Sequence, residues 1–230
     1  MTHESRWMDG VSLLLSLFII AMAVLWLTQV GTFSTSIVSN SRATWYLERG
    51  FGITAYILLT ISVLWGLALS TSAVKPWSPG PLSMLIHATI SWTALVFGMV
   101  HGFLLLFDGY YTYHITNILV PFTGPYRPAA VGLGIIGFWI LVIVTPSFAF
   151  RKHLFSYRTW KLLHYTTYIA FVLITAHGLT AGTDAHRIGF RLLFFGSLFL
   201  SMILLSYRIQ NGKGSRQTRT PAKVSSRSRS

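Results

Sequence analysis

The chain has 230 residues, of which 53% are hydrophobic, 10% are charged and none is cysteine. This composition excludes an ordinary soluble domain and indicates a protein built largely within a membrane, and the lack of cysteine excludes disulfides, iron–sulfur clusters and thiolate-ligated metal centres. The formal net charge of +13 does not indicate a nucleic-acid partner, because the basic residues gather beside apolar segments and in a tail without interleaved aromatic residues.

Six apolar segments approach the length of about 20 residues that a membrane-spanning helix needs. In chain order they are Val11–Val30, Phe51–Ala73, Pro81–Phe107, Ala129–Phe150, Leu162–Ala181 and Ile188–Tyr207. We therefore expect an all-α, polytopic membrane protein whose one domain, residues 11–207, is a six-transmembrane-helix bundle. The first segment is interpreted as a helix rather than a signal peptide, because it is long and lacks a small-residue cleavage site.

Short polar segments flank this domain. Residues 1–10 form a polar lead, and residues 208–230 are basic, low in complexity and poor in large apolar side chains. We expect this tail to be disordered and to lie along anionic lipid headgroups.

Basic residues are distributed unevenly between the two sides that six spans create. The side shared by both termini holds thirteen of them: Arg6, Lys75, Arg151, Lys152, Arg158, Lys161, Arg208, Lys213, Arg216, Arg219, Lys223, Arg227 and Arg229. The opposite side holds Arg42, Arg49, Arg127, Arg187 and Arg191. Because positively charged loops stay in the cytoplasm, we expect both termini to be cytoplasmic, in a multi-pass protein of the plasma or inner membrane.

Two pairs of histidines lie within the apolar segments. His87 and His101 are 14 residues apart, and His164 and His177 are 13 residues apart. At about 1.5 Å of rise per residue, each pair spans roughly 20 Å of helix and places one histidine near each membrane face. Histidine within a membrane is costly and normally has a partner in the protein interior. The pattern indicates two stacked planar cofactors, and haem, with a neutral imidazole on each side of its iron, fits it.

The two histidine-bearing segments run in the same direction. We therefore expect the first histidine of one helix to face the first histidine of the other, and the second to face the second. His87 and His164 would hold an inner haem, and His101 and His177 an outer haem. A spacing of 14 residues returns to within about 40° of the starting direction, but 13 residues rotate His177 by about 140° from His164. The second helix must therefore be tilted or contain a π-bulge or a tightened turn. His186, in the following loop, is the alternative fourth ligand.

The run RKHLFSYRTWKLLHYTTYIAFVLITAHGL, together with the upstream His-x13-His, resembles the ferric-reductase-type transmembrane domain. NADPH oxidases, ferric reductases and the haem subunit of periplasmic methionine sulfoxide reductase share that domain, and the resemblance extends over about Arg49 to Tyr207. It implies a helical bundle that holds b-type haem, two groups here, and passes electrons across the membrane. Nothing after Tyr207 resembles a flavin or nicotinamide domain, so the electron donor is expected to be separate.

Three basic residues are further candidates for contacts with haem propionates. Arg49, at the predicted mouth of the Phe51–Ala73 helix, matches a carboxylate bidentately, and the family has a similar arginine. Its alternative is an interfacial arginine paired with Glu48. Arg158 and Lys161, in the basic loop 151–161, would hold the inner propionates or dock an acidic donor. Their alternative role is simply to keep that loop in the cytoplasm.

Other features of the loops and helices have two interpretations each. Glycines at 52, 66, 132, 134 and 137 either let helices pack closely or make space for a macrocycle. The predicted outer loop Asp108–Pro128 carries tyrosines at 110, 111 and 113, which form an aromatic belt or cover the outer haem. In the last outer loop, Asp184 is expected to pair with Arg187.

The sequence thus favours a membrane b-type cytochrome, an oxidoreductase or an electron-transfer subunit of one. It would carry electrons from a separate cytoplasmic donor, a flavoprotein or a quinol, to an external acceptor. One alternative is a quinol-linked haem anchor of a periplasmic reductase. The other is a haem-free, histidine-lined transporter or proton relay, which would need acidic residues within the spans, and the six predicted segments contain none.

The charge distribution makes a testable prediction of topology. A reporter fused after Ser230 should be active only in the cytoplasm, and one inserted near Thr116 only outside, because the more basic side stays in the cytoplasm. Activity of paired cytoplasmic and external reporters in intact cells measures this. A C-terminal tag that is reached from outside intact cells would contradict the predicted orientation.

Overall fold

The computed structural model of the chain describes residues 10–12, 14–19, 21–22, 41–71 and 78–217. Over this part of the chain every regular element is a helix, and no strand occurs. The all-α class expected from the sequence is therefore confirmed. The predicted lead, apart from Gly10, and residues 218–230 of the predicted tail lie outside the described residues.

Five helices are long and apolar enough to cross a membrane. Their spanning segments are Thr44–Ser70, Gly80–Phe107, Pro128–Phe148, Tyr157–Ala181 and Ile188–Gln210. They correspond to the last five predicted segments, and the chain is a multi-pass membrane protein. Part of the first predicted segment, Val11–Val30, lies outside the described residues, and the rest of it is helical. A sixth span and the side on which each terminus lies stay predictions.

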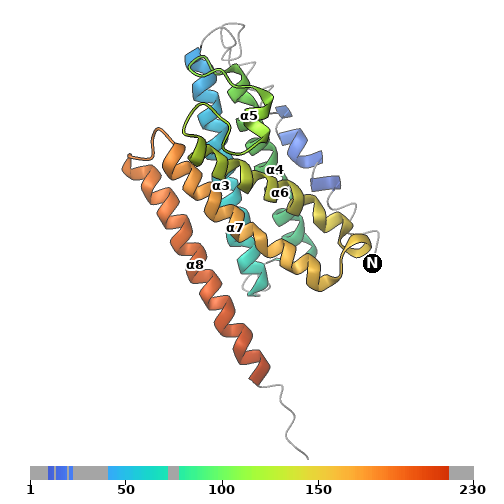
Figure 1. Cartoon of the computed structure of the whole chain (residues 1–230). Coiled ribbons are helices and arrows are strands. Elements are labelled where there is room, and N and C mark those ends of the chain that lie inside the picture. The colour runs from blue at the N-terminus through green and yellow to red at the C-terminus, as the bar shows by residue number, and fades with distance from the viewer. Residues whose placement is uncertain (1–9, 13, 20, 23–40, 72–77, 218–230) are drawn as a thin grey trace, which may run out of the picture.

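The helices follow one another with few residues between them. They are α3 (Ser41–Ser70), α4 (Gly80–Leu104), the 3₁₀ turn η1 (Leu105–Phe107), α5 (Ile115–Leu119), α6 (Pro128–Leu154), α7 (Tyr157–Ala181) and α8 (Ile188–Gln217), as Figure 1 shows. Local chemistry fixes several starts. Pro81 lies in the first turn of α4 and Pro128 opens α6, where a missing N–H is harmless. Ser156 caps α7 by accepting a hydrogen bond from the N–H of Thr159.

Four helices are longer than the sequence predicted. α6 runs to Leu154 and α7 begins at Tyr157, so the predicted basic loop 151–161 is wrong except at residues 155 and 156. α3 begins at Ser41, ten residues before the predicted start at Phe51, because no proline or glycine occurs from Ser41 to Arg49 to stop a helix there. α8 runs to Gln217, so the predicted disordered tail is helical over residues 208–217. No proline occurs between the start of α8 at Ile188 and Pro221.

The described helices form two pairs of neighbours, α3 with α4 and α6 with α7, each packed closely along its length. The two pairs touch each other less extensively than their own members do. Figure 1 shows α6 and α7 running obliquely across α3 and α4, with α8 along one side.

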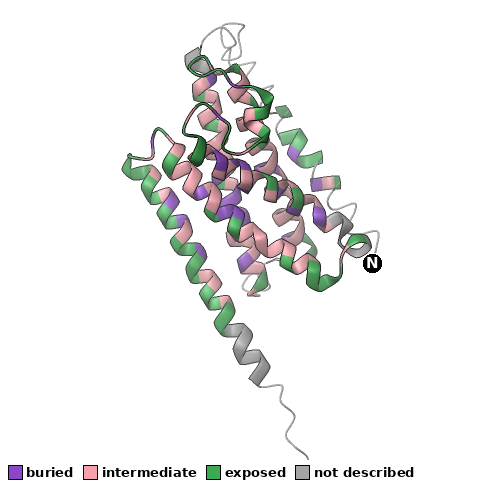
Figure 2. Cartoon of the chain, viewed as in Figure 1, coloured by how far each residue is buried: buried purple, intermediate pink, exposed green. Residues whose placement is uncertain are grey.

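Tyr56 stands at the centre of the buried core. Its ring stacks on Phe171, with the ring centroids 5.9 Å apart, and lies 4.6 Å from the ring of Phe194. Its hydroxyl bonds to the hydroxyls of Thr175 at 3.0 Å and Ser197 at 2.6 Å. One side chain of α3 thus contacts both α7 and α8. Figure 2 shows buried residues where these helices meet and exposed residues along the outer side of α8.

The N-terminal helical segment packs against α4. Ser16 is buried, and its hydroxyl lies 3.2 Å from the carbonyl oxygen of Thr89 and 2.8 Å from the hydroxyl of Thr93. Small hydroxyl side chains let helices approach closely in a membrane and satisfy one another. This segment therefore belongs to the same bundle.

The Tyr56 hydroxyl predicts a measurable contribution to stability. In Tyr56→Phe, Thr175 and Ser197 keep their bonds to carbonyls of their own helices, so the loss should be modest, about 0.5–1.5 kcal/mol, with a lower Tm. Thermal unfolding of the purified protein in detergent measures it. Tyr207→Phe, on the exposed side of α8, is the matched control. The same Tm in both variants would show that the hydroxyl bonds do not stabilise the bundle.

Candidate functional site

The four predicted histidines lie on two helices, one from each packed pair. His87 and His101 are on α4, and His164 and His177 are on α7. The ring centroids of His87 and His164 are 6.3 Å apart, and those of His101 and His177 are also 6.3 Å apart. The structure thus brings together the pairs that the sequence predicted, and two similar imidazole pairs occupy the two ends of the bundle.

The rings of His101 and His177 are oriented by backbone carbonyls of the helices behind them. Nδ1 of His101 lies 2.9 Å from the carbonyl oxygen of Glu48, and Nδ1 of His177 lies 3.0 Å from that of Ala130. A carbonyl oxygen can only accept, so each Nδ1 must carry the proton and donate it. Each Nε2 is left with a free lone pair, as a metal-ligating histidine requires.

Glycine makes both of these contacts possible. A Cβ atom at Gly52 would lie 2.9 Å from Nδ1 of His101, and one at Gly134 would lie 2.8 Å from Cγ and Nδ1 of His177. Each glycine follows its carbonyl residue by four positions, so it occupies the next turn of the same helix face. The imidazole therefore rests on bare backbone, and a larger residue would displace it.

The His87–His164 end repeats part of this arrangement. A Cβ atom at Gly66 would lie 3.1 Å from Cε1 of His87, and the hydroxyl of Ser62, four residues before, is 3.5 Å from Nδ1 of His87. His164 is held differently, because its ring stacks on Trp160 with centroids 5.3 Å apart and an interplanar angle of 22°. The first turn of α7 thus supports its own histidine.

α7 is a continuous α-helix from Tyr157 to Ala181. Neither a π-bulge nor a tightened turn lies between His164 and His177, so the oblique course of α7 across α4, visible in Figure 1, accommodates the 13-residue spacing. His186, the alternative ligand, is exposed in the loop before α8. His177, by contrast, faces His101 and lines the cavity between the helix pairs.

That cavity, of about 840 Å³, surrounds the His101–His177 pair. It is lined mainly by apolar and aromatic side chains of α3, α4, α6, α7 and the start of α8. Its volume is in the range of cofactor and small-molecule sites. Both glycines beside these histidines, Gly52 and Gly134, lie in its wall, so they also leave space for a flat ligand.

The loop between α4 and α6 covers this end. Tyr126 donates its hydroxyl proton to the carbonyl of Ala181 at 3.2 Å, and Arg127 donates to the carbonyl of Thr180, which fastens the loop to the end of α7. Tyr110 and Tyr111 line the cavity and are exposed, so they can serve both predicted roles, as a cover and as an aromatic belt.

Tyr113 in the same loop is buried. Burial, together with the nearby carboxylates of Glu48 and Asp108, raises the pKa of Tyr113 to about 12. The phenol therefore stays protonated at physiological pH and presents a neutral hydroxyl beside the cavity.

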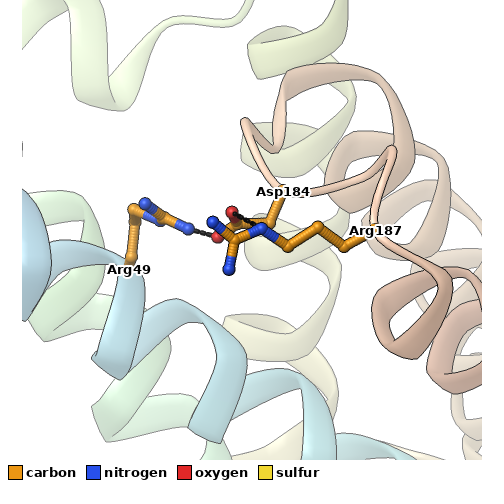
Figure 3. Close-up of polar contacts among 3 residues, drawn as sticks. All are labelled: Arg49, Asp184 and Arg187. Carbon is orange, nitrogen blue, oxygen red and sulfur yellow. Dashed lines mark ion pairs between the residues drawn. The ribbon is translucent and has the colours of Figure 1, made fainter.

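One interpretation of the sequence paired Arg49 with Glu48, but the structure does not show that pair. Its guanidinium forms an ion pair with Asp184 and lies 4.0 Å from the ring centroid of Trp45. Asp184 also pairs with Nε of Arg187 at 3.1 Å, as expected. Figure 3 shows Asp184 between the two arginines, one from α3 and one from the loop before α8. Arg49 lines the cavity, and its contact with a propionate stays a prediction.

The other predicted basic contacts lie at the start of α7. Arg158 is exposed, and Nζ of Lys161 lies 5.8 Å and 5.9 Å from the ring centroids of Tyr157 and Tyr165. Lys161 thus borders two aromatic rings one turn before His164. Contacts of these two residues with haem stay predictions.

Acidic residues are placed differently from the sequence prediction. Because α3 begins early, Glu48 lies within the span Thr44–Ser70, so the expectation of no acidic residue in the spans is wrong. Its carboxylate is 4.0 Å from Nδ1 of His101. The three carboxylates of the described residues, Glu48, Asp108 and Asp184, all line the cavity at this end.

The imidazole spacing tests whether a metal fits between the rings. A metal-bound imidazole nitrogen lies about 2.0–2.1 Å from the metal, and its ring centre about 1.2 Å farther, so two rings on opposite sides of one metal have centroids about 6.4 Å apart. Both pairs, at 6.3 Å, match that value. No group of three or more metal-binding side chains occurs among the described residues. Two protein ligands per metal suit an iron whose other ligands are porphyrin nitrogens.

The sequence analysis did not predict the groups that accept the Nδ1 hydrogen bonds of His101 and His177, which are the carbonyls of Glu48 and Ala130. Their signal was present in the spacing of the glycines. Gly52 and Gly66 are 14 residues apart, as are His87 and His101, so antiparallel helices place one glycine against each histidine.

Comparison with known proteins gave one match. A family model described as the ferric reductase like transmembrane component matches residues 51–175. This range includes three of the four histidines, and the fourth, His177, lies two residues beyond it. No curated protein and no solved structure matches the chain.

The glycine contacts predict which substitutions displace the rings. Gly52→Ala and Gly134→Ala should each lower the haem retained per chain, because the added Cβ overlaps an imidazole and overpacking costs about 1–3 kcal/mol. Gly196→Ala on α8, where the Cβ would meet nothing within 4 Å and which does not line the cavity, is the matched control. Alanine favours helix over glycine by about 1 kcal/mol, so a loss reflects the contact alone. Haem per chain by absorbance measures it, and equal retention in all three variants would contradict the steric argument.

Proposed function

The chain belongs to the ferric reductase-like transmembrane family, and from this we propose that it is a membrane b-type cytochrome that carries electrons across the membrane through two haem groups. One observation carries the proposal: two imidazole pairs, each with ring centroids 6.3 Å apart, lie at opposite ends of the same two helices. A route across a membrane needs a relay site near each face, and the transmembrane electron transfer of this family supplies the activity.

The chain's own residues would hold and orient the two groups. His87 and His164 would ligate one iron, and His101 and His177 the other, with Nδ1 of the second pair fixed by backbone carbonyls. Bound haem would supply one-electron chemistry at an iron with no open position, which suits electron transfer rather than reaction with a substrate. The buried apolar core around Tyr56 would limit the access of water to the bound groups.

We place the His87–His164 end at the cytoplasmic face, because the more basic side of the chain lies there. A cytoplasmic redox donor would approach this end, where Arg158 is exposed and Lys161 lies nearby. Basic side chains of this kind attract an acidic flavoprotein, and salt weakens that attraction. Electrons would leave at the other end, beside the cavity, and pass to an external acceptor. The membrane would be the plasma or inner membrane.

The cavity supports a second candidate, a quinol-linked membrane subunit of a reductase. About 840 Å³ of largely apolar space at the His101–His177 end, bordered by exposed Tyr110 and Tyr111, suits a hydrophobic quinone ring as well as the edge of a haem. In that case electrons would enter from within the membrane, and their entry would not depend on salt.

Reconstituted vesicles test the proposal. The full chain is inserted with its cytoplasmic face outward, ferricyanide is trapped in the lumen, and a reduced flavoprotein is added outside. We expect bleaching of ferricyanide in proportion to haem content, loss of this activity in His87→Ala and His101→Ala, and a several-fold slower rate in Arg158→Gln with Lys161→Gln at low salt.

The outcomes separate the candidates. A well-folded protein from haem-replete cells that is colourless contradicts both cytochrome proposals. Full haem reduction by quinol alone, with rates that neither salt nor the Arg158 and Lys161 substitutions change, favours the quinol-linked subunit instead.

A further inference from the structure

Arg208 lies within a membrane span rather than in the tail to which the sequence assigned it. α8 continues past it, and the span Ile188–Gln210 includes it. Its side chain is partly buried. A charged residue within a span is costly, so its presence there indicates a partner or a function.

Its contacts fix the guanidinium beside the ligand helix. Nη1 donates to the hydroxyl of Tyr168 at 3.1 Å, Nη2 donates to the hydroxyl of Tyr165 at 2.9 Å, and the guanidinium carbon lies 5.2 Å from the ring centroid of Tyr165. Tyr165 directly follows His164 in the chain, and Tyr168 lies about one turn of α7 beyond it. These contacts thus hold one positive charge close to the His87–His164 pair.

This charge has no carboxylate partner in the described part of the chain. The carboxylates there are Glu48, Asp108 and Asp184, and all three line the cavity around the other histidine pair. The partners of Arg208 are neutral phenols, which orient its charge without cancelling it. Arg158, one of the two basic residues that the sequence predicted to act at this end, is exposed and therefore screened by water.

We propose that Arg208 raises the reduction potential of the haem held by His87 and His164 and leaves the other haem unaffected. The inference rests on the proposed function. Reduction of ferric to ferrous iron adds one electron and removes one positive charge from the site, so a fixed cation nearby favours the reduced form. The interaction is strong where the surroundings are apolar. Arg208 is a positioning and tuning residue, not a ligand.

Potentiometric titration of the purified full chain, followed by its visible spectrum, tests this. In Arg208→Gln we expect the reduction equilibrium of one haem to fall about tenfold, equivalent to about 59 mV for one electron, with haem content unchanged. Arg208→Lys should keep most of the potential. Arg191→Gln is the matched control, because Arg191 is exposed at the opposite end of α8 and its side chain donates to the carbonyl of Ala185.

A second set assigns the shifted component. In the His177→Ala background only the His87–His164 haem should remain, and Arg208→Gln should shift it there too. Tyr165→Phe combined with Tyr168→Phe keeps the positive charge but removes the two hydroxyls that hold the guanidinium in place. We expect a smaller shift of the reduction potential in the same direction, and this variant serves if Arg208→Gln fails to fold.

The results distinguish this inference from the proposed function. Two haems with unchanged potentials in Arg208→Gln overturn the inference and leave the proposed function intact. Loss of one haem in both Arg208 variants would mean that the residue serves to retain the cofactor, and this result also overturns the inference. A wild-type chain without haem overturns the proposed function itself.

Discussion

Four imidazole rings inside an apolar bundle are the constraint on which the rest of the structure depends. Such rings cannot be left without partners, because an unpaired polar group away from water costs about 1–3 kcal/mol. The bundle meets this need by placing bare helix backbone behind two of them, so that the carbonyls of Glu48 and Ala130 accept the Nδ1 proton. The same contact sets the tautomer, aims the ring and brings α3 onto α4 and α6 onto α7. Close packing within each helix pair and an open interface between the pairs are both consistent with it.

Charge is arranged along the bundle as well as between its two faces. Arg208 lies beside the His87–His164 pair with no carboxylate partner among the described residues, whereas at the other end Asp184 pairs with Arg49 and Arg187. If the Arg208 end faces the cytoplasm, its fixed positive charge holds an electron at the inner site and opposes outward transfer. A membrane potential that is negative inside acts in the opposite sense, by about 2.3 kcal/mol per elementary charge at 100 mV. A balance between these two fields would make the transfer sensitive to the energy state of the membrane.

The sequence predicted the features that local pattern encodes. Apolar length indicated the last five spans, and the histidine spacing indicated pairs that meet in the structure. The start of α3 was out of reach, since no local signal marks Ser41 as a boundary once proline and glycine are absent. The partner of Arg49 was also out of reach, because Asp184 is distant in the chain and only the fold brings them together. The orientation of His177 depended on the course of α7 across α4, which an ideal isolated helix does not contain.

The register of α3 against α4 has a consequence for how this gene can change. Gly52 lies opposite His101 and Gly66 opposite His87, so two equal intervals run antiparallel and must stay matched in length. Loss or gain of one residue inside either interval would shift the rest of that helix by about 1.5 Å and turn it by about 100°, so one glycine would always miss its histidine. A substitution elsewhere in either interval leaves this register unchanged, but a change of length does not. Descendants of this gene should therefore keep these two intervals at constant length, whereas the far end of α8, which projects beyond the bundle in Figure 1, is free to lengthen or shrink.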